Sequence, residues 1–566
     1  MPDSNQRMKV VLCWHMHQPD YRGPDNSSYQ LPWVYLHGIK DYVDMAAHLE
    51  NYPDARAVVN FAPVLLEQLD DYVAQIKGWL VRGKQIKDPF LAALAGPGIP
   101  LDQESRRGLM KACLRANEKH MRGRFRTFRR LTDIVALVDD HAESSAYLND
   151  QFIIDLLVWY HLVWMGEFPR ANDLRIKSLE KKRKGFNSED RFRLIEAICD
   201  LLSSVVERYR KLAQEGRVEL SVTPYAHPII PLLLDIESAR EAVPDMGLPQ
   251  RVVYPGGEER SRWHIRRGIE SFEKFFGFRP NGCWPAEGSI SEGTLRLLDE
   301  EQFTWVASGQ QVLHNSLARS YAGAAWPEQW THRPYRVKDN KINCFFRNDN
   351  LSDLIGFTYA DWHAEDAVSN LIHNLESIAD NSSTPSNLVV SIILDGENAW
   401  EHYPRNGCFF LDNLYKRLSA HPTLEMTTFS EVVEKKLPTY NINSLVAGSW
   451  VYGTFSTWIG EKDKNRAWEA LIDAKTVYDR VMASGRLAPA VVKQAELQMA
   501  TCEGSDWFWW FGDYNPGETV ADFEQLFRNQ LKHLYIILGE EPPAYLTQVF
   551  AIGGGDPAMG GVMRSN

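Results

Sequence analysis

The stretch SIILDGENAWEHYPRNG, residues 391–407, decides the fold class of this sequence. The apolar run Leu388–Leu394 leads into it and fits a fully buried β-strand. Three acidic residues follow this strand at once, beside Trp400: Asp395, Glu397 and Glu401. Acidic side chains resist burial unless they are paired or used in chemistry. The cluster therefore indicates either the cap of a following helix or a functional site at the end of a strand.

Six further apolar runs alternate with long helical stretches, which predicts a parallel α/β sheet, either a barrel or a doubly wound sheet. The seven runs are Lys9–Trp14, Ala55–Phe61, Arg217–Val222, Gly282–Trp284, Phe303–Ala307, Ile342–Arg347 and Leu388–Leu394. Polar residues accompany the ends of these runs: His15, His17, Asn60, Glu219, His227, Glu287, Asp349 and Asp395. Active sites of parallel α/β barrels lie at the carboxyl ends of the strands, so this pattern favours a barrel.

The length of 566 residues predicts two or three domains. Residues from about 64 to 212 are helical in pattern and far exceed one crossover, so we expect an inserted helical subdomain there. Three amphipathic stretches follow Pro438: Asn465–Ser484, Pro489–Cys502 and Glu518–Leu538. We expect a catalytic domain over 1–436 and a C-terminal helical domain over 437–566 that completes the active-site cleft.

Composition excludes several classes of partner. The net charge of −12 argues against nucleic acid, and the one dense basic run, Lys181–Lys184, is typical of a solvated helix end. The N-terminus has no signal-peptide core, and no stretch approaches the roughly 18 apolar residues of a membrane span. Seven singly spaced cysteines indicate reduced thiols, so we expect a cytoplasmic protein that has no membrane partner.

Two other stretches pair carboxylates with aromatic residues. In GCWPAEGSISEGTL, residues 282–295, Glu287 follows a strand and precedes a helix that Ser289 or Ser291 could cap. Capping or helix-dipole roles for its carboxylate are as plausible as catalysis. In TCEGSDWFWWFGDYN, residues 501–515, Asp506 and Asp513 flank a run of aromatics, a combination that suits sugar binding. Core packing of Trp509 or Trp510 remains open.

The segment HMHQP, residues 15–19, places His15 and His17 two residues apart, which on a strand points both imidazoles the same way. This pair could bind a metal if His227 or His402 joined it through the fold. Hydrogen bonding to a polyol is the favoured role for His17, and a structural role for His15. A metal-dependent deacetylase would need a His/Asp triad, which the sequence does not assemble. We therefore expect no metal and no other cofactor.

Two carboxylates at the ends of different strands are what glycosidic cleavage requires, since one attacks or stabilises the anomeric carbon and the other protonates the leaving oxygen. Glu287 and Asp395 fit these needs. Five segments also resemble, in order, the five sequence regions of glycoside hydrolase family 57. They are HMHQP (15–19), RVELSVTPYAHPIIPLL (217–233), GCWPAEGSISE (282–292), IILDGENAWEHYPRNG (392–407) and EGSDWFWWFG (503–512).

The resemblance implies a (β/α)7 barrel followed by a helical bundle, with retaining chemistry on α-glucans and no required metal. By motif, Glu287 is the nucleophile and Asp395 the general acid/base. The residues assigned to substrate binding are His17, Gln18, Glu219, His227, Trp284, Glu397, Trp400, Asp506 and Trp507.

Specificity is less sharply indicated. The flanks WPAEGS and LDGENAWE look like the α-amylase and amylopullulanase branch, whereas branching enzymes of the family carry a Cys where this chain has Gly288. We expect hydrolysis of α-1,4 bonds in an α-glucan. Cleavage of α-1,6 bonds, 4-α-glucanotransferase activity and glucan branching stay open, as does oligomeric state. A non-catalytic glucan-binding protein and a metal-dependent deacetylase are rivals from other classes.

Overall fold

The computed structural model describes residues 7–96, 99–100, 102–139, 147–321 and 328–555, and its centre is a single sheet. The strands of this sheet are β1 Met8–Met16, β2 Ala57–Phe61, β3 Val218–Val222, β4 Gly282–Cys283, β5 Trp305–Ser308, β6 Tyr335–Val337, β7 Asn343–Phe346, β8 Val389–Asp395, β9 Leu424–Met426 and β10 Tyr440–Ile442. Every residue of β1 is buried, as expected of a parallel strand covered on both faces.

Seven of these strands form a closed parallel barrel. Neighbours follow the order β8-β1-β2-β3-β4-β5-β7, and all pair in parallel. A parallel bridge between Arg347, just after β7, and Ser391 of β8 joins the two ends of the row. The (β/α)7 architecture is thus confirmed, and each of the seven predicted runs overlaps one barrel strand.

Three short strands lie outside the ring. β6 pairs antiparallel with β7, β10 pairs with β6, and β9 pairs with the first residues of β1. Each has three residues, too few to give a hydrophobic period, so the sequence pattern does not predict these strands. Because β10 (Tyr440–Ile442) joins the sheet, the chain stays on the barrel beyond residue 437.

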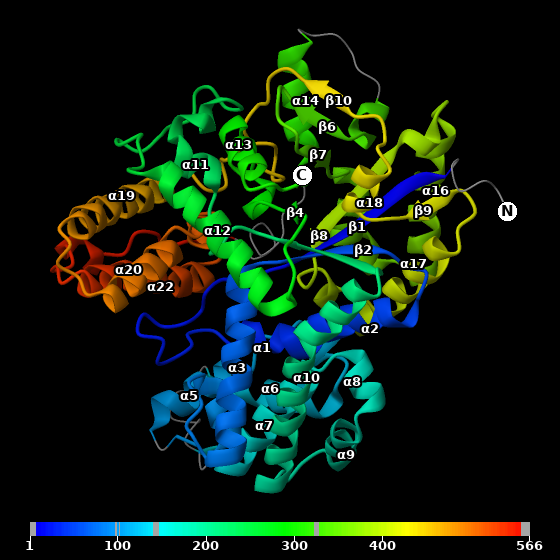
Figure 1. The fold of residues 1–566 in the computed structure, drawn as a ribbon. Helices are drawn as coiled ribbons and strands as arrows, with labels where there is room; N and C mark the ends of the chain where they lie inside the picture. The colour runs from blue at the N-terminus through cyan, green and yellow to red at the C-terminus, as the bar shows by residue number, and fades with distance from the viewer. Residues whose placement is uncertain (1–6, 97–98, 101, 140–146, 322–327, 556–566) are drawn as a thin grey trace.

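Helices surround the barrel and extend it in two directions (Figure 1). Those up to the third barrel strand are α1 Trp33–His37, α2 Val43–Asn51, α3 Pro63–Arg82, α4 Pro89–Ala95, α5 Gln103–Ala112, α6 Arg126–Asp139, α7 Asp150–Val163, α8 Glu167–Asn172, α9 Leu174–Lys182 and α10 Ser188–Gln214. Those from α3 to α10 coincide with the expected insertion and lie together below the barrel in Figure 1. Asn187 and Asp190 form a reciprocal capping box that fixes the start of the long α10.

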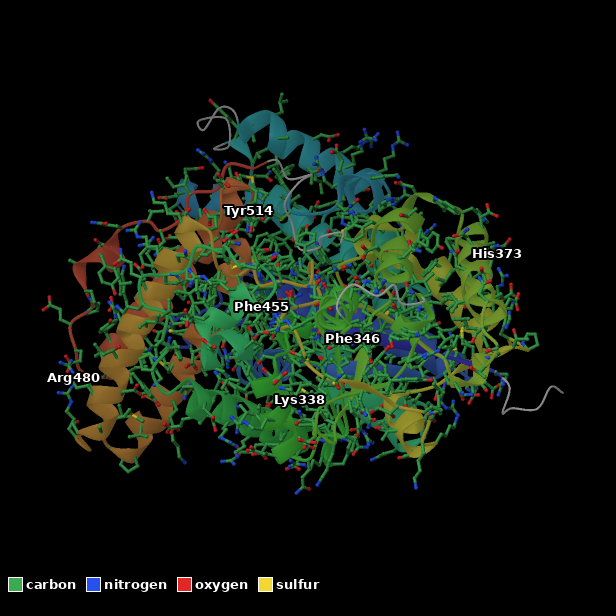
Figure 2. The ribbon with its side chains drawn as sticks, turned by 90° about the horizontal axis from the view of Figure 1, so that it is seen from above. Lys338, Phe346, His373, Phe455, Arg480 and Tyr514 are labelled. Atoms are coloured by element: carbon green, nitrogen blue, oxygen red, sulfur yellow. The ribbon has the colours of Figure 1, made fainter. Side chains whose placement is uncertain are left out.

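The remaining helices complete the barrel wall and a C-terminal group. They are α11 Ile230–Leu234, α12 Gly257–Phe276, α13 Glu292–Glu300, α14 Gln310–Ser320, α15 Asp349–Asp353, α16 Ala364–Asp380, α17 Cys408–Ser419, α18 Phe429–Glu434, α19 Lys462–Ala483, α20 Pro489–Cys502, α21 Asp506–Trp510 and α22 Gly517–Ile537. Ser291 caps α13 by accepting a hydrogen bond from the Thr294 amide, one of the two caps the sequence suggested. Seen from above, Arg480 on α19 and His373 on α16 mark opposite sides of the molecule (Figure 2).

The C-terminal helices α19, α20 and α22 pack together beside the barrel (Figure 1). They correspond to the three amphipathic stretches expected in this part of the chain. Within the described residues, none of the helices combines the length and the apolar character that crossing a bilayer requires.

The buried Arg347 side chain holds the barrel closed. It donates to the backbone carbonyl of Ile393 at 2.9 Å and pairs with Asp349 at 2.8 Å and Asp353 at 2.7 Å. Arg347 is only 4% exposed, so its removal would leave two largely buried carboxylates without their partner.

We predict that Arg347→Met lowers the free energy of unfolding by about 3–5 kcal/mol, the usual cost of breaking a buried ion pair from one side. Urea denaturation followed by tryptophan fluorescence measures this. The matched control is Arg336→Met on β6, whose side chain is exposed and which should change stability by less than about 0.5 kcal/mol. Equal effects of the two substitutions would contradict this role for Arg347.

Candidate active site

A cavity of about 360 Å³ opens at the carboxyl ends of the barrel strands and contains both predicted catalytic carboxylates. Its polar lining comprises His15, His17, Gln18, His37, Arg115, Asn117, His227, Glu287, Asp395, Glu397, Asn398, Glu401 and Asp506. Its aromatic lining comprises Tyr21, Trp33, Trp164, Trp450, Trp509, Trp510 and Phe523. This combination of an apolar wall with converging polar groups is typical of a small-molecule site.

Asp395 is the last residue of β8 and enters the cavity from the barrel rim. The register of β1 and β8 pairs it with His15. Burial raises the pKa of the Asp395 carboxyl, and the hydrogen bond that Asn398 Nδ2 donates to its Oδ2 at 2.8 Å opposes this only in part. Because the raised pKa favours the protonated form, Asp395 is suited to give a proton to a leaving group.

Glu287 lies in a tight turn after β4, and its backbone is in the left-handed region, with φ of 57° and ψ of 26°. Strained backbone of this kind is concentrated at functional sites. The indole of Trp450 donates to Glu287 Oε2 at 3.0 Å, and the Trp450 amide donates to the Glu287 carbonyl, also at 3.0 Å. Gly288 follows with φ of 56°, and a Cβ there would approach the Trp284 ring to 2.8 Å. Trp450 therefore holds Glu287 at both its carboxylate and its backbone carbonyl.

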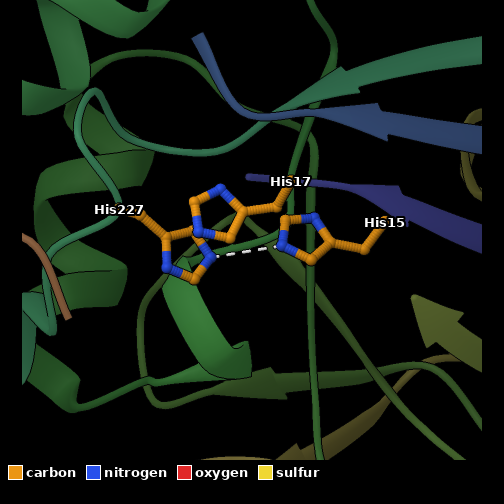
Figure 3. A group of neighbouring side chains, drawn as sticks. All are labelled: His15, His17 and His227. Atoms are coloured by element: carbon orange, nitrogen blue, oxygen red, sulfur yellow. Dashed lines mark hydrogen bonds between the residues drawn. The ribbon is translucent and has the colours of Figure 1, made fainter. Parts of the chain in front are cut away.

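Three imidazoles lie together (Figure 3), and they line the same cavity as the two carboxylates. His15 Nε2 and His227 Nε2 are 3.2 Å apart, and the His17 ring stacks on that of His227 with centroids 3.8 Å apart. Burial lowers the pKa of His15 to about 3 and that of His227 well below its usual value, and the neighbouring imidazoles add to both shifts. His15 and His227 are therefore neutral at physiological pH. Of the two possible third histidines, the fold brings in His227, whereas His402 is half exposed and pairs with Glu401.

The C-terminal segment reaches the cavity through Asp506. The Asp506 carboxylate accepts a hydrogen bond from His17 Nε2 at 2.8 Å, and the Ser505 amide donates to the His227 carbonyl at 2.9 Å. Residues far apart in the sequence therefore form one site.

The buried Glu397 carboxylate holds the HMHQP segment, residues 15–19, in place. It accepts hydrogen bonds from Gln18 Nε2 at 3.1 Å and from the His17 amide at 3.3 Å. Burial raises the pKa of Glu397 well above its usual value, and the nearby Asp395 adds to this shift. Glu397 and Gln18 thus line the cavity and also position the histidines.

Four of the residues assigned to substrate binding do not line this cavity. Trp507 is 1% exposed and packs on Phe523 and Phe527, so it belongs to the core, whereas the next turn of α21 presents its neighbours Trp509 and Trp510 to the cavity. Glu219 is the second residue of β3, away from the carboxyl end of the strand. Its carboxylate accepts hydrogen bonds from the Trp305 indole and the Ser430 hydroxyl.

Trp400 and Trp284 are also buried. Trp400 packs on Trp14 and Tyr403, and its indole donates to the Gly396 carbonyl at 2.9 Å. Trp284 lies beneath the turn that contains Glu287, with its ring centroid 5.2 Å from that of Trp450. We expect both side chains to support the residues that line the cavity without contacting a ligand themselves.

Several lining residues carried no signal in the sequence. Trp33 belongs to α1, and Arg115 and Trp164 come from the helical insertion, so only the tertiary fold brings them to the cavity. An ion pair of 3.0 Å between Arg115 and Asp522 joins the insertion to α22 at the rim. A second cavity of about 720 Å³ lies alongside in the insertion and shares Trp33 and Arg115 with the first.

Comparison with known proteins gives a family match over most of the chain. Residues 11–445 match the model of glycosyl hydrolase family 57. A 1,4-α-glucan branching enzyme from Thermococcus kodakarensis is 23% identical over 162 residues, which are 25% of this chain and 21% of that enzyme. The matched segment therefore spans about a fifth of that relative's length.

Solved structures resemble the chain over nearly its whole length. A family 57 branching enzyme from the same Thermococcus species has a TM-score of 0.57 at 15% identity, covering 94% of this chain and 90% of the other. An α-amylase from Thermotoga maritima has a TM-score of 0.56 at 14% identity, covering 96% and 94%. At these identities the likeness shows the fold.

The barrel and the family match define the class of protein: this is an enzyme of the glycoside hydrolase type. More particularly, the chain belongs to glycosyl hydrolase family 57.

We predict that Trp450→Phe lowers kcat for a glycosidic substrate by about 10- to 100-fold and changes KM much less, because a hydrogen bond to a charged group is worth about 1.5–3 kcal/mol. Phe keeps the ring but cannot donate to Glu287. Steady-state kinetics measures the two constants separately. Trp362→Phe, at a side chain 43% exposed, is the control and should leave both unchanged. A raised KM with unchanged kcat would show that Trp450 only contacts substrate.

Proposed function

We propose that the chain cleaves α-1,4-glucosidic bonds in α-glucans by a retaining mechanism, with Glu287 as nucleophile and Asp395 as general acid/base. The observation that carries this proposal is the placement of Glu287 and Asp395, from the ends of two different strands, in one cavity lined with tryptophans. Retaining enzymes need two carboxyl groups about 5–5.5 Å apart, so that one can form a bond to the sugar. A binding protein would need neither.

The local environments support these two roles. Asp395, with its raised pKa, gives its proton to the glycosidic oxygen as that bond breaks. Glu287, which the Trp450 indole orients, attacks the anomeric carbon and forms the glycosyl-enzyme. Water or a sugar hydroxyl then attacks the same carbon, gives its proton to Asp395 and releases Glu287. His17, Asp506 and Trp509 are placed to hold the sugar in the cavity.

Transfer to a sugar acceptor is a second candidate, which the likeness to branching enzymes favours. The adjoining cavity, reached past Trp33 and Arg115, offers room for a second stretch of glucan. Against branching stands Gly288, whose left-handed backbone and contact with the Trp284 ring leave no space for the cysteine that branching enzymes carry there. We place the reaction in the cytoplasm, as the cysteine pattern predicts.

Variants of the two carboxylates test the proposed roles with an activated α-glucosyl substrate. In Asp395→Ala the glycosyl-enzyme still forms, and azide, which needs no base, should restore turnover and give the α-glycosyl azide. In Glu287→Ala azide should occupy the vacated space and attack the substrate directly, giving the β-azide. Nuclear magnetic resonance of the products distinguishes the anomers. Reversed anomers would exchange the two roles, and full activity in either variant would refute the proposal.

Products from maltoheptaose and pullulan distinguish the two candidates. Hydrolysis predicts shorter maltooligosaccharides only, because water is the acceptor, and cleavage of pullulan would add α-1,6 activity. Transfer predicts products longer than maltoheptaose, and new α-1,6 linkages would indicate branching. Chromatography with linkage analysis reads these outcomes. The Glu287→Gln variant is the control, and products that persist in it would come from a contaminant.

A further inference from the structure

The three-histidine cluster has the spacing of a metal site. One nitrogen from each of His15, His17 and His227 lies within 4.8 Å of the other two. The Nε2 atoms of His15 and His227 are 3.2 Å apart. Two imidazole nitrogens bound at about 2.0–2.1 Å to a tetrahedral Zn²⁺ ion lie about 3.4 Å apart, so the separation of these two atoms matches that of two ligands. Because the His17 and His227 rings are parallel, they must turn before both lone pairs can point at one ion. His15 belongs to β1 and His17 follows directly after that strand, whereas His227 approaches from the opposite side (Figure 3).

Hydrogen bonds at His15 Nδ1 and His17 Nε2 fix the tautomers of these two rings. Asn60 Oδ1 bonds His15 Nδ1 at 2.7 Å and also accepts from Thr223, while Asn60 Nδ2 donates to Ser221. His15 Nδ1 therefore carries the proton, and its Nε2 presents a lone pair to the cluster. Such outer hydrogen bonds orient the histidines of metal sites.

His17 is oriented in the same way. Its Nε2 donates to the Asp506 carboxylate at 2.8 Å, which leaves the lone pair on Nδ1. That Nδ1 atom is buried and has no hydrogen-bond partner among the described residues. This arrangement of carboxylate, imidazole and free nitrogen is the one found around bound zinc.

His227 completes the set through a change of tautomer. Its Nδ1 lies 2.8 Å from the Ser505 hydroxyl, which can accept or donate. With no ion bound, His227 Nε2–H donates to His15 Nε2. If the proton moves to Nδ1 and Ser505 becomes the acceptor, Nε2 becomes a third ligand without loss of a proton from the protein.

We propose that His15, His17 and His227 bind a divalent transition-metal ion of the Zn²⁺ type, and that an ion held there closes the cavity to sugar. Three neutral imidazoles select Zn²⁺, Cu²⁺ or Ni²⁺ over Ca²⁺ and Mg²⁺, which prefer oxygen ligands. The ion would lie in the cavity that holds Glu287 and Asp395, where its charge attracts carboxylates and its volume excludes the sugar ring. The exclusion of sugar from the cavity rests on the proposed function, whereas the binding of the metal ion does not.

Co²⁺, which reports tetrahedral nitrogen ligation by visible absorption, tests the binding directly on the full chain, with calorimetric titration of Zn²⁺ beside it. One ion per chain is expected. His17→Ala should abolish the tetrahedral spectrum, and Ser505→Ala, which removes only an outer partner, should weaken Zn²⁺ binding by about 10- to 100-fold. The control is His363→Ala, an exposed histidine outside the cluster, which should match the parent chain. Circular dichroism verifies that each variant is folded.

Binding that stays the same in Ser505→Ala and His17→Ala would overturn the assignment, as would the absence of a stoichiometric site. Because Ser505→Ala keeps all three ligands, it remains informative even if His17→Ala does not fold.

Inhibition tests the closing effect. In the parent chain, Zn²⁺ at ten times its dissociation constant should raise the KM for maltoheptaose by about tenfold and leave kcat unchanged, as competition requires. Full activity with the site saturated would refute the closure. Complete absence of glucan activity would refute the proposed function instead, and the Co²⁺ titration would be unaffected by that result.

Discussion

Parallel pairing of β1 with both β2 and β8 fixes the position of the groups in the cavity. Its register places His15 opposite Asn60 on one side and opposite Asp395 on the other. A slip of one residue would turn His15 and His17 to the opposite face of the strand and separate them from His227. The bridge between Arg347 and Ser391 gives β8 a second barrel neighbour, so that this strand is paired on both edges. The arrangement of the groups in the cavity therefore depends on this register.

A buried ion network attaches the C-terminal helices to this barrel. Glu503, at the end of α20, accepts hydrogen bonds from Arg260 and His264 of α12 and from Tyr254. Although burial by itself raises the pKa of Glu503, the charge of Arg260 and the contact with His264 lower it to about 2. Removing one partner from a buried carboxylate that is paired in this way is costly, because the remaining charge stays buried. Since Asp506 follows three residues later, the same network holds it against His17.

The sequence was sufficient for elements whose pattern is local. Strands such as β1 and β8 are buried on both faces and are predominantly apolar in sequence. Glu287 and Asp395 are noticeable in the sequence because a carboxylate directly after such a strand is costly to bury unless it is paired or used in chemistry. Trp450 had no such signal, since only the tertiary fold brings its indole to Glu287. Trp507 was misplaced because α21 is five residues long, and the face that a short helix buries depends on its neighbours. Glu219 is absent from the cavity lining for a different reason. It lies early in its strand, whereas the residues that form the site of a barrel lie at the carboxyl ends of the strands.

Rigidity is distributed unevenly around the cavity. The floor holds Glu287 in a left-handed turn between Trp284 and Trp450, and Asp395 at the end of a fully paired strand. The rim is joined by Arg115 and Asp522, whose side chains are 42% and 38% exposed, and an ion pair in such a setting contributes at most about 1 kcal/mol. Under the proposed function, these preorganised groups at the floor would keep the two carboxylates in place during the reaction. Under the proposed function, this weak contact at the rim would oppose the entry and exit of a long glucan chain only slightly.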